Sequence, residues 1–167
     1  MKQKTIQHKS GFPPIIQADS KVLILGSMPG EKSLAEQQYY AHGRNLFWPF
    51  MALLFNTNIP EHYEDKKSLL LSNKIAVWDV CDACIRQGSL DTAILDEIPN
   101  ALDVLQEQYP NIKTIAFNGQ KAASLFRKYF KQKAAIMYIT LPSTSPANAG
   151  ISIDKKKEMW MSLKELL

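Results

Sequence analysis

Four short apolar runs, each followed by a polar loop, limit the fold of this chain more than any other feature. The runs cover residues 22–25, 75–78, 114–117 and 136–139. Each is short and partly β-branched or aromatic, which is typical of buried strands rather than of helices. The sequence therefore predicts four strands, and the loops that follow them are where functional side chains are expected.

Longer segments with helical spacing separate these runs. We expect helices over residues 45–55, 61–71, 99–109 and 120–130, and a last helix that is capped by Asp154 and continues to the C-terminus. In the third of these helices Pro99 would take the first position, where its missing N–H costs nothing. Strands that alternate with helices predict a parallel sheet covered on both faces. In such sheets ligands bind outside the carboxyl ends of the strands, where the four polar loops would lie.

The length of 167 residues predicts one domain, with residues 1–20 as a peripheral N-terminal segment. The longest apolar runs span only a few residues, which is too short to cross a membrane. The first twelve residues are too polar for a signal peptide. We therefore expect a cytoplasmic protein with no membrane partner.

The net charge of +4 and the pI near 9.0 favour a polyanionic partner. The excess lysines and arginines form clusters at the start of the chain (Lys2, Lys4), late in the chain and near its C-terminal end. Each cluster alone also fits a solvated helix face. Arg44 stands among aromatic residues in the first polar loop. A cation beside aromatic rings suits a phosphate whose base is stacked.

The sequence offers little for a metal or for redox chemistry. Cys81 and Cys84 form one C-x-x-C, which has too few ligands for a structural zinc, so we expect buried thiols rather than a reactive pair. His42 is far in sequence from the other two histidines. We expect no metal and no cofactor. The first loop, GSMPGEKS, is not a phosphate-binding Walker loop, because Glu31 stands where glycine is needed.

Five motifs in order along residues 22–149 are similar to one known family. They read GSMPG, YYAHGRNLFW, VWDVCDACIRQGSLD, FNGQKA and LPSTSPANA. This pattern resembles the hypoxanthine-DNA glycosylase branch, often called family 6, of the uracil-DNA glycosylase superfamily. One departure is visible, since that family commonly has proline where this chain has Gly43.

The resemblance implies an α/β fold, a three-layer α/β/α sandwich around a central four-stranded parallel sheet. It implies a monofunctional, metal-independent enzyme of DNA repair that flips a deaminated base out of double- or single-stranded DNA. Hydrolysis of the N-glycosidic bond, above all that of hypoxanthine in deoxyinosine, would leave an abasic site. We expect the enzyme to act as a monomer.

The resemblance places two catalytic amides, Asn45 and Asn118, in this chain. An amide orients water with its oxygen and donates to a base with its nitrogen, but it accepts no proton at pH 7. Catalysis would then depend on positioning and on stabilising the leaving base. The alternative for Asn45 is a helix cap, and for Asn118 a simple turn at the end of a strand.

Four residues are expected to contact the base. Ser27 and Met28 occupy the first turn, where many relatives in the wider superfamily carry aspartate or asparagine, so the role of positioning water would have moved elsewhere. Phe47 is the stacking candidate, with a place in the core as the alternative. Asp79 would orient water or accept from the base edge, or would only cap a short segment over 80–85.

DNA contacts are expected from two loops, through the residues His42, Arg44, Ser143, Thr144 and Ser145. The hydroxyl groups would donate to phosphate oxygens, although a turn-rich surface loop is the alternative. Leu141 stands where many relatives have histidine, which argues against efficient excision of uracil.

Lys32 and Lys121 are the lysines nearest the loops, and neither clearly suits a Schiff base, so strand cleavage is not expected.

Three other functions remain open: a glycosylase that prefers uracil, a nucleic-acid-binding module without catalysis, and a nucleotide hydrolase or transferase.

Overall fold

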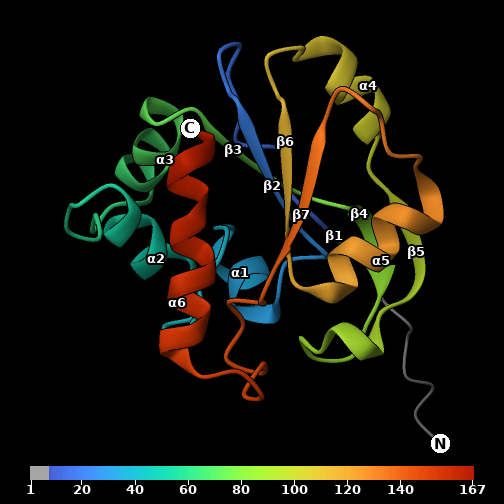
Figure 1. Cartoon of the computed structure of the whole chain (residues 1–167). Coiled ribbons are helices and arrows are strands. Elements are labelled where there is room, and N and C mark those ends of the chain that lie inside the picture. Colours follow the sequence, from blue (N-terminus) through green and yellow to red (C-terminus); the bar gives the residue numbers. More distant parts are fainter. Residues whose placement is uncertain (1–7) are drawn as a thin grey trace, which may run out of the picture.

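A four-stranded parallel sheet forms the centre of the computed structural model, which describes residues 8–167 (Figure 1). Its strand order is β3-β2-β6-β7, and every neighbouring pair is parallel. The strands are β2 (Val22–Gly26), β3 (Ile75–Asp79), β6 (Thr114–Asn118) and β7 (Met137–Leu141). All four predicted strands are confirmed, and the fourth extends two residues further than expected. Its register pairs it with β6 as far as Asn118.

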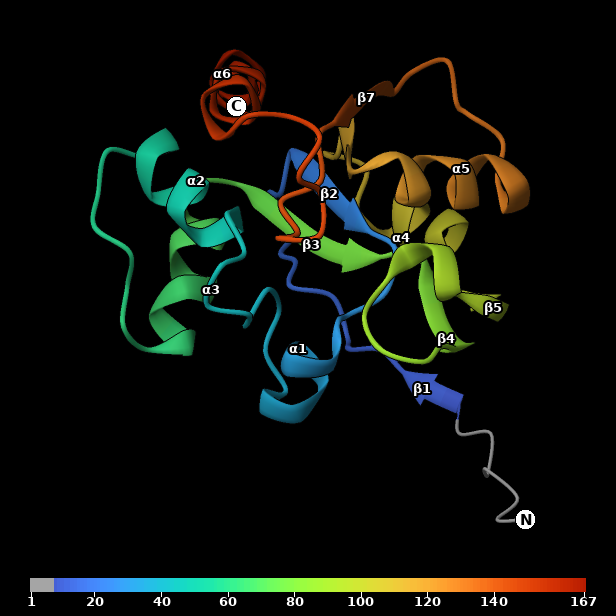
Figure 2. The same cartoon turned by 90° about the horizontal axis from the view of Figure 1, so that it is seen from below.

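Helices cover both faces of this sheet (Figure 2). One face carries α2 (Phe47–Leu54), α3 (Tyr63–Ser72) and α6 (Ile153–Met161), and the other carries α4 (Leu102–Gln108) and α5 (Gln120–Tyr129). Successive side chains of a strand point to opposite faces. In β2, Val22 and Ile24 accordingly join the core under α2, α3 and α6, whereas Leu23 and Leu25 join the core under α4 and α5. The predicted three-layer fold is therefore confirmed.

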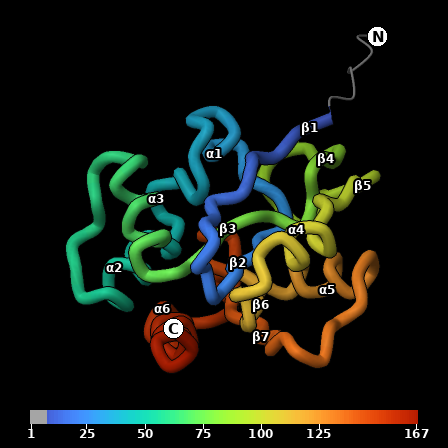
Figure 3. Tube along the Cα trace, turned by 90° about the horizontal axis from the view of Figure 1, so that it is seen from above, coloured from blue at the N-terminus to red at the C-terminus, as the bar shows by residue number. Residues whose placement is uncertain are grey.

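A second, antiparallel sheet lies beside the first and was not predicted (Figure 3). It has the order β1-β4-β5, with β1 (His8–Ser10), β4 (Cys81–Ile85) and β5 (Leu95–Pro99). These strands carry interspersed charged residues and no continuous apolar run, so they gave little signal in the sequence. The segment over 80–85 that Asp79 was expected to cap is therefore a strand and not a helix.

Several helix boundaries differ from the prediction because local capping groups compete. Pro99 does not begin a helix; it ends β5 opposite Cys81, a position that needs no backbone donor, and the helix begins at Leu102. The last helix is capped by Ser152 and not by Asp154, since the Ser152 hydroxyl accepts from the backbone nitrogen of Lys155 at 3.2 Å. That helix ends at Met161, and the 3-10 helix η2 (Ser162–Leu166) follows it.

The expected peripheral segment over 1–20 is packed into the fold wherever the structure describes it. Residues 8–10 pair with β4, and Ile15 forms a bridge with Val77 and is buried in the core. Residues 1–7, which include two lysines of the first basic cluster, lie outside the described residues. Across residues 8–167, no helix has the length and apolarity that crossing a membrane requires.

Candidate active site

A pocket of about 560 Å³ lies at the carboxyl ends of the four parallel strands. The last residue of each strand lines it, and the register brings Gly26 opposite Asp79 and Asn118 opposite Leu141. The loops after these strands complete the wall. Nine predicted site residues line the pocket, namely Ser27, Met28, His42, Asn45, Asp79, Asn118, Ser143, Thr144 and Ser145. Arg44 and Phe47 do not.

Asn118 is held rigidly by one neighbour. Its Nδ2 donates to Oγ1 of Thr144 at 2.9 Å, and its Oδ1 accepts from the backbone nitrogen of Thr144 at 2.9 Å. The Asn118 side chain is only 7% exposed and that of Thr144 only 1%. Thr144 was expected to bind phosphate, but in this structure its hydroxyl is almost fully buried and accepts from Asn118.

The turn after Asn118 depends on a glycine. Gly119 has a φ of +98°, and a Cβ built there would lie 3.0 Å from Cβ of Ser143. Only glycine combines this backbone conformation with so close an approach. The close approach holds the end of β6 against the loop that carries Ser143, Thr144 and Ser145.

Asn45 lines the pocket and also supports the start of α2. Its Oδ1 accepts from the backbone nitrogen of Phe47 at 2.9 Å, which orients the amide and fixes which of its ends is the oxygen. Among residues 8–167, no side-chain hydrogen bond uses its amide nitrogen. The capping role and the pocket role are therefore compatible, since the nitrogen is left to donate to a ligand.

Asp79 is a buried carboxyl group in the pocket wall. Its side chain is 4% exposed, and its Oδ2 has no hydrogen-bond partner among residues 8–167. Burial and, to a smaller extent, the negative charge of Asp91 raise the pKa of Asp79, while Arg86 lowers it, and the net result is a pKa of about 7. The carboxyl group fits only because Gly26 has no side chain: a Cβ at this position would lie 2.4 Å from Oδ1 of Asp79.

Ser27 is engaged by a residue that the sequence did not single out. Its hydroxyl donates to Oδ1 of Asp91 at 2.5 Å, and Asp91 lies in the 3-10 helix η1 (Asp91–Ala93), far along the chain. Its only signal in the sequence is an acid after a Gly-Ser pair, which is too common to be informative. Met28 reaches the pocket, but most of its side chain is buried in the core under α4 and α5.

Phe47 lies in the core and not on the pocket wall. Its side chain is fully buried, and its ring stacks on Tyr40 with centroids 4.0 Å apart. The expectation that Phe47 itself stacks on a base is therefore not met in this structure. Tyr40 lines the pocket in its place, and burial raises the pKa of its phenol, which keeps the hydroxyl protonated. In the sequence, Tyr40 is only one of several aromatic residues in the first polar loop.

The rim of the pocket combines cations and hydroxyl groups. His42 and Arg44 are exposed, and Nδ1 of His42 accepts from the backbone nitrogen of Arg44 at 3.1 Å. Lys32 and Lys121 line the rim, and Lys32 pairs with Glu36 at 2.6 Å. These groups are available to the phosphates of a bound strand.

Side chains of α6 anchor the loop after β7. The indole nitrogen of Trp160 donates to the carbonyl of Pro142 at 2.8 Å, and Nζ of the buried Lys156 donates to the carbonyl of Asn148 at 2.5 Å. Both donors are buried, so the loop is held at two points.

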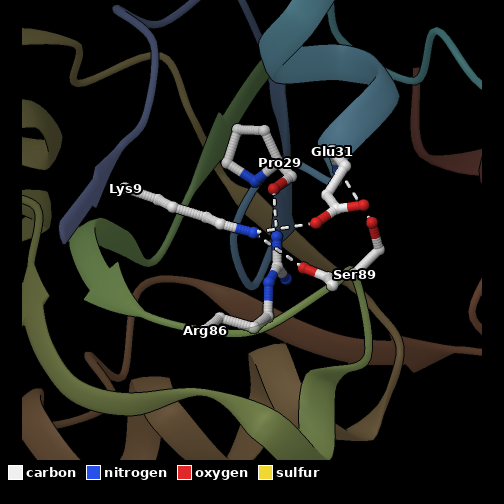
Figure 4. Close-up of polar contacts among 6 residues, drawn as sticks. Lys9, Pro29, Glu31, Arg86 and Ser89 are labelled. Atoms are coloured by element: carbon white, nitrogen blue, oxygen red, sulfur yellow. Dashed lines mark hydrogen bonds and ion pairs between the residues drawn. The ribbon is translucent and has the colours of Figure 1, made fainter. Parts of the chain in front are cut away.

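A polar cluster ties the turn after β2 to the segment before Asp91 (Figure 4). The buried guanidinium of Arg86 donates to the carbonyl of Pro29, and the hydroxyl of Ser89 accepts from the backbone nitrogen of Glu31 at 2.7 Å. Lys9 of β1 donates to the carbonyl of Gly88 at 2.9 Å and lies 3.4 Å from the Glu31 carboxylate. These contacts fix where Asp91 meets Ser27.

The two cysteines lie in β4, outside the pocket. Both are buried and neither forms a disulfide, as expected. Burial raises the pKa of the Cys81 thiol to about 12 and also raises that of Cys84. Within residues 8–167, no three His, Cys, Asp or Glu side chains are grouped as metal ligands.

Comparison with known proteins identifies the family. The family model described as the uracil DNA glycosylase superfamily matches residues 13–166. The chain is 37% identical over 155 residues to a hypoxanthine DNA glycosylase of Methanosarcina barkeri, covering 91% of this chain and 95% of that protein. A hypoxanthine DNA glycosylase of Methanosarcina acetivorans is 37% identical over 153 residues, covering 90% and 94%.

A solved structure agrees with these relatives. It is the solution NMR structure of a Methanosarcina acetivorans protein provisionally described as a uracil DNA glycosylase, with a TM-score of 0.80 and 34% identity. The likeness covers 95% of this chain and 97% of the other. The chain belongs to the uracil DNA glycosylase superfamily, which confirms the predicted superfamily and makes DNA its class of substrate.

Proposed function

We propose that this chain is a monofunctional DNA glycosylase that hydrolyses the N-glycosidic bond of hypoxanthine in DNA and leaves an abasic site. The observation that carries the proposal is the meeting of Asn45 and Asn118, from two distant motifs, in one pocket at the sheet edge. The two Methanosarcina relatives named hypoxanthine DNA glycosylase support the choice of base. A pocket of about 560 Å³ falls in the size range of small-molecule sites, which suits a flipped nucleotide.

In this proposal the two amides and Asp79 recognise and stabilise the leaving base. The free nitrogen of Asn45 donates to the base, and Asn118, held by Thr144, presents a fixed polar edge. With its pKa near 7, Asp79 keeps a proton in much of the enzyme near neutral pH and donates it in a hydrogen bond to a base nitrogen or oxygen. Charge that develops on the departing base meets donors already in position, which lowers the barrier.

Stacking and phosphate contacts complete the proposed complex. Tyr40, supported from behind by Phe47, is the pocket aromatic against which a flipped base stacks. His42, Arg44, Ser143 and Ser145 contact the phosphates around the flipped nucleotide. Four properties remain predictions: action on double- or single-stranded DNA, a monomeric enzyme, independence of metal and cofactor, and a cytoplasmic location.

The first test measures base release from matched duplexes that contain one deoxyinosine, one deoxyuridine or no lesion. The reactions contain a chelator, and abasic sites are cleaved with alkali. We expect release from deoxyinosine, and loss of that release in Asn45→Ala and Asn118→Ala. Asn58→Ala, an exposed residue outside the pocket, is the matched control and should retain activity.

Base release and DNA binding, measured together, separate two of the alternatives from this proposal. Faster release from deoxyuridine would favour a uracil glycosylase, and DNA binding without any release would favour a binding module. A covalent adduct trapped by borohydride would contradict the monofunctional mechanism.

A further inference from the structure

The turn after β2 carries no carboxylate of its own, yet a carboxylate from a distant segment lies against it. Asp91 accepts from the Ser27 hydroxyl at 2.5 Å, and both residues line the pocket. Asp91 is partly exposed, whereas Asp79 is buried in the wall formed by the strand ends. A partly exposed carboxylate at this position reaches both a bound nucleotide and water from the solvent.

The position of Asp91 is fixed by contacts on both sides of it in the sequence. Arg86 is anchored to the Pro29 carbonyl, and the Ser89 hydroxyl binds the backbone nitrogen of Glu31. The backbone nitrogen of Ile94 bonds to the Asp91 carbonyl at 3.2 Å, which closes the single turn of η1, and Ile94 itself is buried. A catalytic group must be held by its surroundings in this way to position a reactant.

The two pocket carboxyl groups differ in environment. Asp79 is buried and Asp91 is partly exposed, and burial together with the negative charge of Asp91 raises the pKa of Asp79. Oδ2 of Asp79 has no partner among residues 8–167 and lines the same pocket. When one carboxyl group of a site is buried and another is exposed, the two commonly take separate acid and base roles.

We propose that Asp91 is the catalytic carboxylate that positions the attacking water, with Ser27 holding one of its oxygens; this role rests on the glycosylase function proposed above. Oδ1 is bound by Ser27, and the other oxygen accepts a hydrogen bond from water. The N-glycosidic bond breaks with its electron pair passing to the base nitrogen, and the water oxygen bonds to C1′ of the sugar. The proton that the water loses passes to Asp91 and then to solvent, and the released base takes up a proton.

The test compares single-turnover release of hypoxanthine by Asp91→Asn, Asp91→Ala and Asp96→Asn. Asp91→Asn keeps the acceptor for Ser27 and removes only the charge. Asp96→Asn removes the same charge from an exposed residue nearby that does not line the pocket. We expect Asp91→Asn to slow release about 100-fold or more, with affinity for an abasic-site duplex within about threefold of wild type. Formate should restore part of the activity of Asp91→Ala.

The pH–rate profile separates a catalytic role from a structural one. The other titratable groups that line the pocket with Asp91 include Asp79, Glu31, Lys32, Lys121 and His42, and the buried Arg86 lies in the segment before Asp91. Asp91→Asn should lack the acid-side fall in rate that the wild-type enzyme shows, because the variant has lost the carboxylate that takes the proton from water. His42→Gln, which removes the only imidazole that lines the pocket among residues 8–167, should still show this fall, since the carboxylate of Asp91 is unchanged.

The inference is overturned if Asp91→Asn releases hypoxanthine within threefold of the wild-type rate, or if Asp96→Asn is slowed equally. It is also overturned if the acid limb persists in Asp91→Asn and formate restores nothing to Asp91→Ala. An active wild-type enzyme with an active Asp91→Asn variant refutes only the role of Asp91. A wild-type protein that releases no base refutes the glycosylase function and this role with it.

Discussion

Thr144 binds the Asn118 amide at both of its polar ends, through its hydroxyl and its backbone nitrogen. The carbonyl of the same threonine accepts from the backbone nitrogen of Leu46, next to Asn45, at 3.0 Å. One buried residue thus connects the loop after β7 to both candidate catalytic amides. Its burial keeps water from competing for these hydrogen bonds.

Thr144→Val should lower both stability and activity. Valine keeps the shape of the side chain but leaves Nδ2 of the buried Asn118 without an acceptor, which costs about 1–3 kcal/mol. Urea unfolding and single-turnover release would measure the two effects. Thr57→Val, at an exposed site with no side-chain hydrogen bond among residues 8–167, is the control and should change neither. An unaltered Thr144→Val enzyme would show that this contact does not position Asn118.

Gly26→Ala should displace the Asp79 carboxyl group. A Cβ at Gly26 would lie 2.4 Å from Oδ1 of Asp79 and 3.4 Å from the Tyr40 hydroxyl, so at least one of these groups must move. We expect base release to fall at least tenfold, and the free energy of unfolding to drop by about 1–3 kcal/mol, as for other overpacked sites. Gly150→Ala, where a Cβ meets nothing within 4 Å, should behave as wild type in both assays.

The stability of Asp79→Asn relative to wild type should increase with pH. The pKa of Asp79 rises from its ordinary value of 3.8 to about 7 on folding. Between these values the folded protein holds a proton that the unfolded chain has lost, so wild-type stability falls as pH rises through this window.

Asparagine removes this dependence. We subtract the free energy of unfolding of the wild type from that of Asp79→Asn. This difference should increase by on the order of 2 kcal/mol between pH 5 and pH 7.5. Urea unfolding at both pH values measures it, and Asn58→Ala, which removes no titratable group, should give a constant difference. A pH-independent difference for Asp79→Asn would mean that folding leaves the pKa of this carboxyl group unchanged.

Phe47 substitutions should affect stability more than chemistry. Phe47→Ala removes a fully buried ring and should cost about 3–5 kcal/mol, whereas Leu53→Ala in the same helix, 51% exposed, should cost under about 1 kcal/mol. Phe47→Leu should retain most of the activity per folded molecule, because Tyr40 faces the pocket. A folded Phe47→Leu enzyme with no activity would restore Phe47 as the stacking residue.

Cys81 and Cys84 should resist alkylation in the native protein. Both thiols are buried and their pKa values are raised, so few thiolates are present near pH 8. Iodoacetamide labelling followed by mass spectrometry should find the native chain largely unmodified and the urea-unfolded chain modified twice. Rapid labelling of the native chain would indicate a reactive pair.

Local sequence determined the framework of this protein. Each of the four apolar runs became a strand of the parallel sheet. The runs in β2, β3 and β6 are buried almost throughout, which favours a strand covered by helices on both faces, whereas β7 is a partly exposed edge strand. Because Asp79 and Asn118 follow two of these runs directly, the sequence alone predicts that both lie at one edge of the sheet. Helix ends were less certain, since Ser152 and Asp154 are equally good local caps and the folded backbone selected Ser152.

The tertiary structure alone decided which side chains are free to act. The sequence indicates a surface hydroxyl at Thr144, but packing buries this side chain against Asn118. Phe47, the expected stacking residue, lies in the core because α2 turns it inward, and Tyr40 lines the pocket instead. Asp91 meets Ser27 only because the second sheet and the Arg86 anchor bring residues 64 positions apart together. Periodicity and capping act over a few residues, whereas such meetings depend on how the whole chain packs.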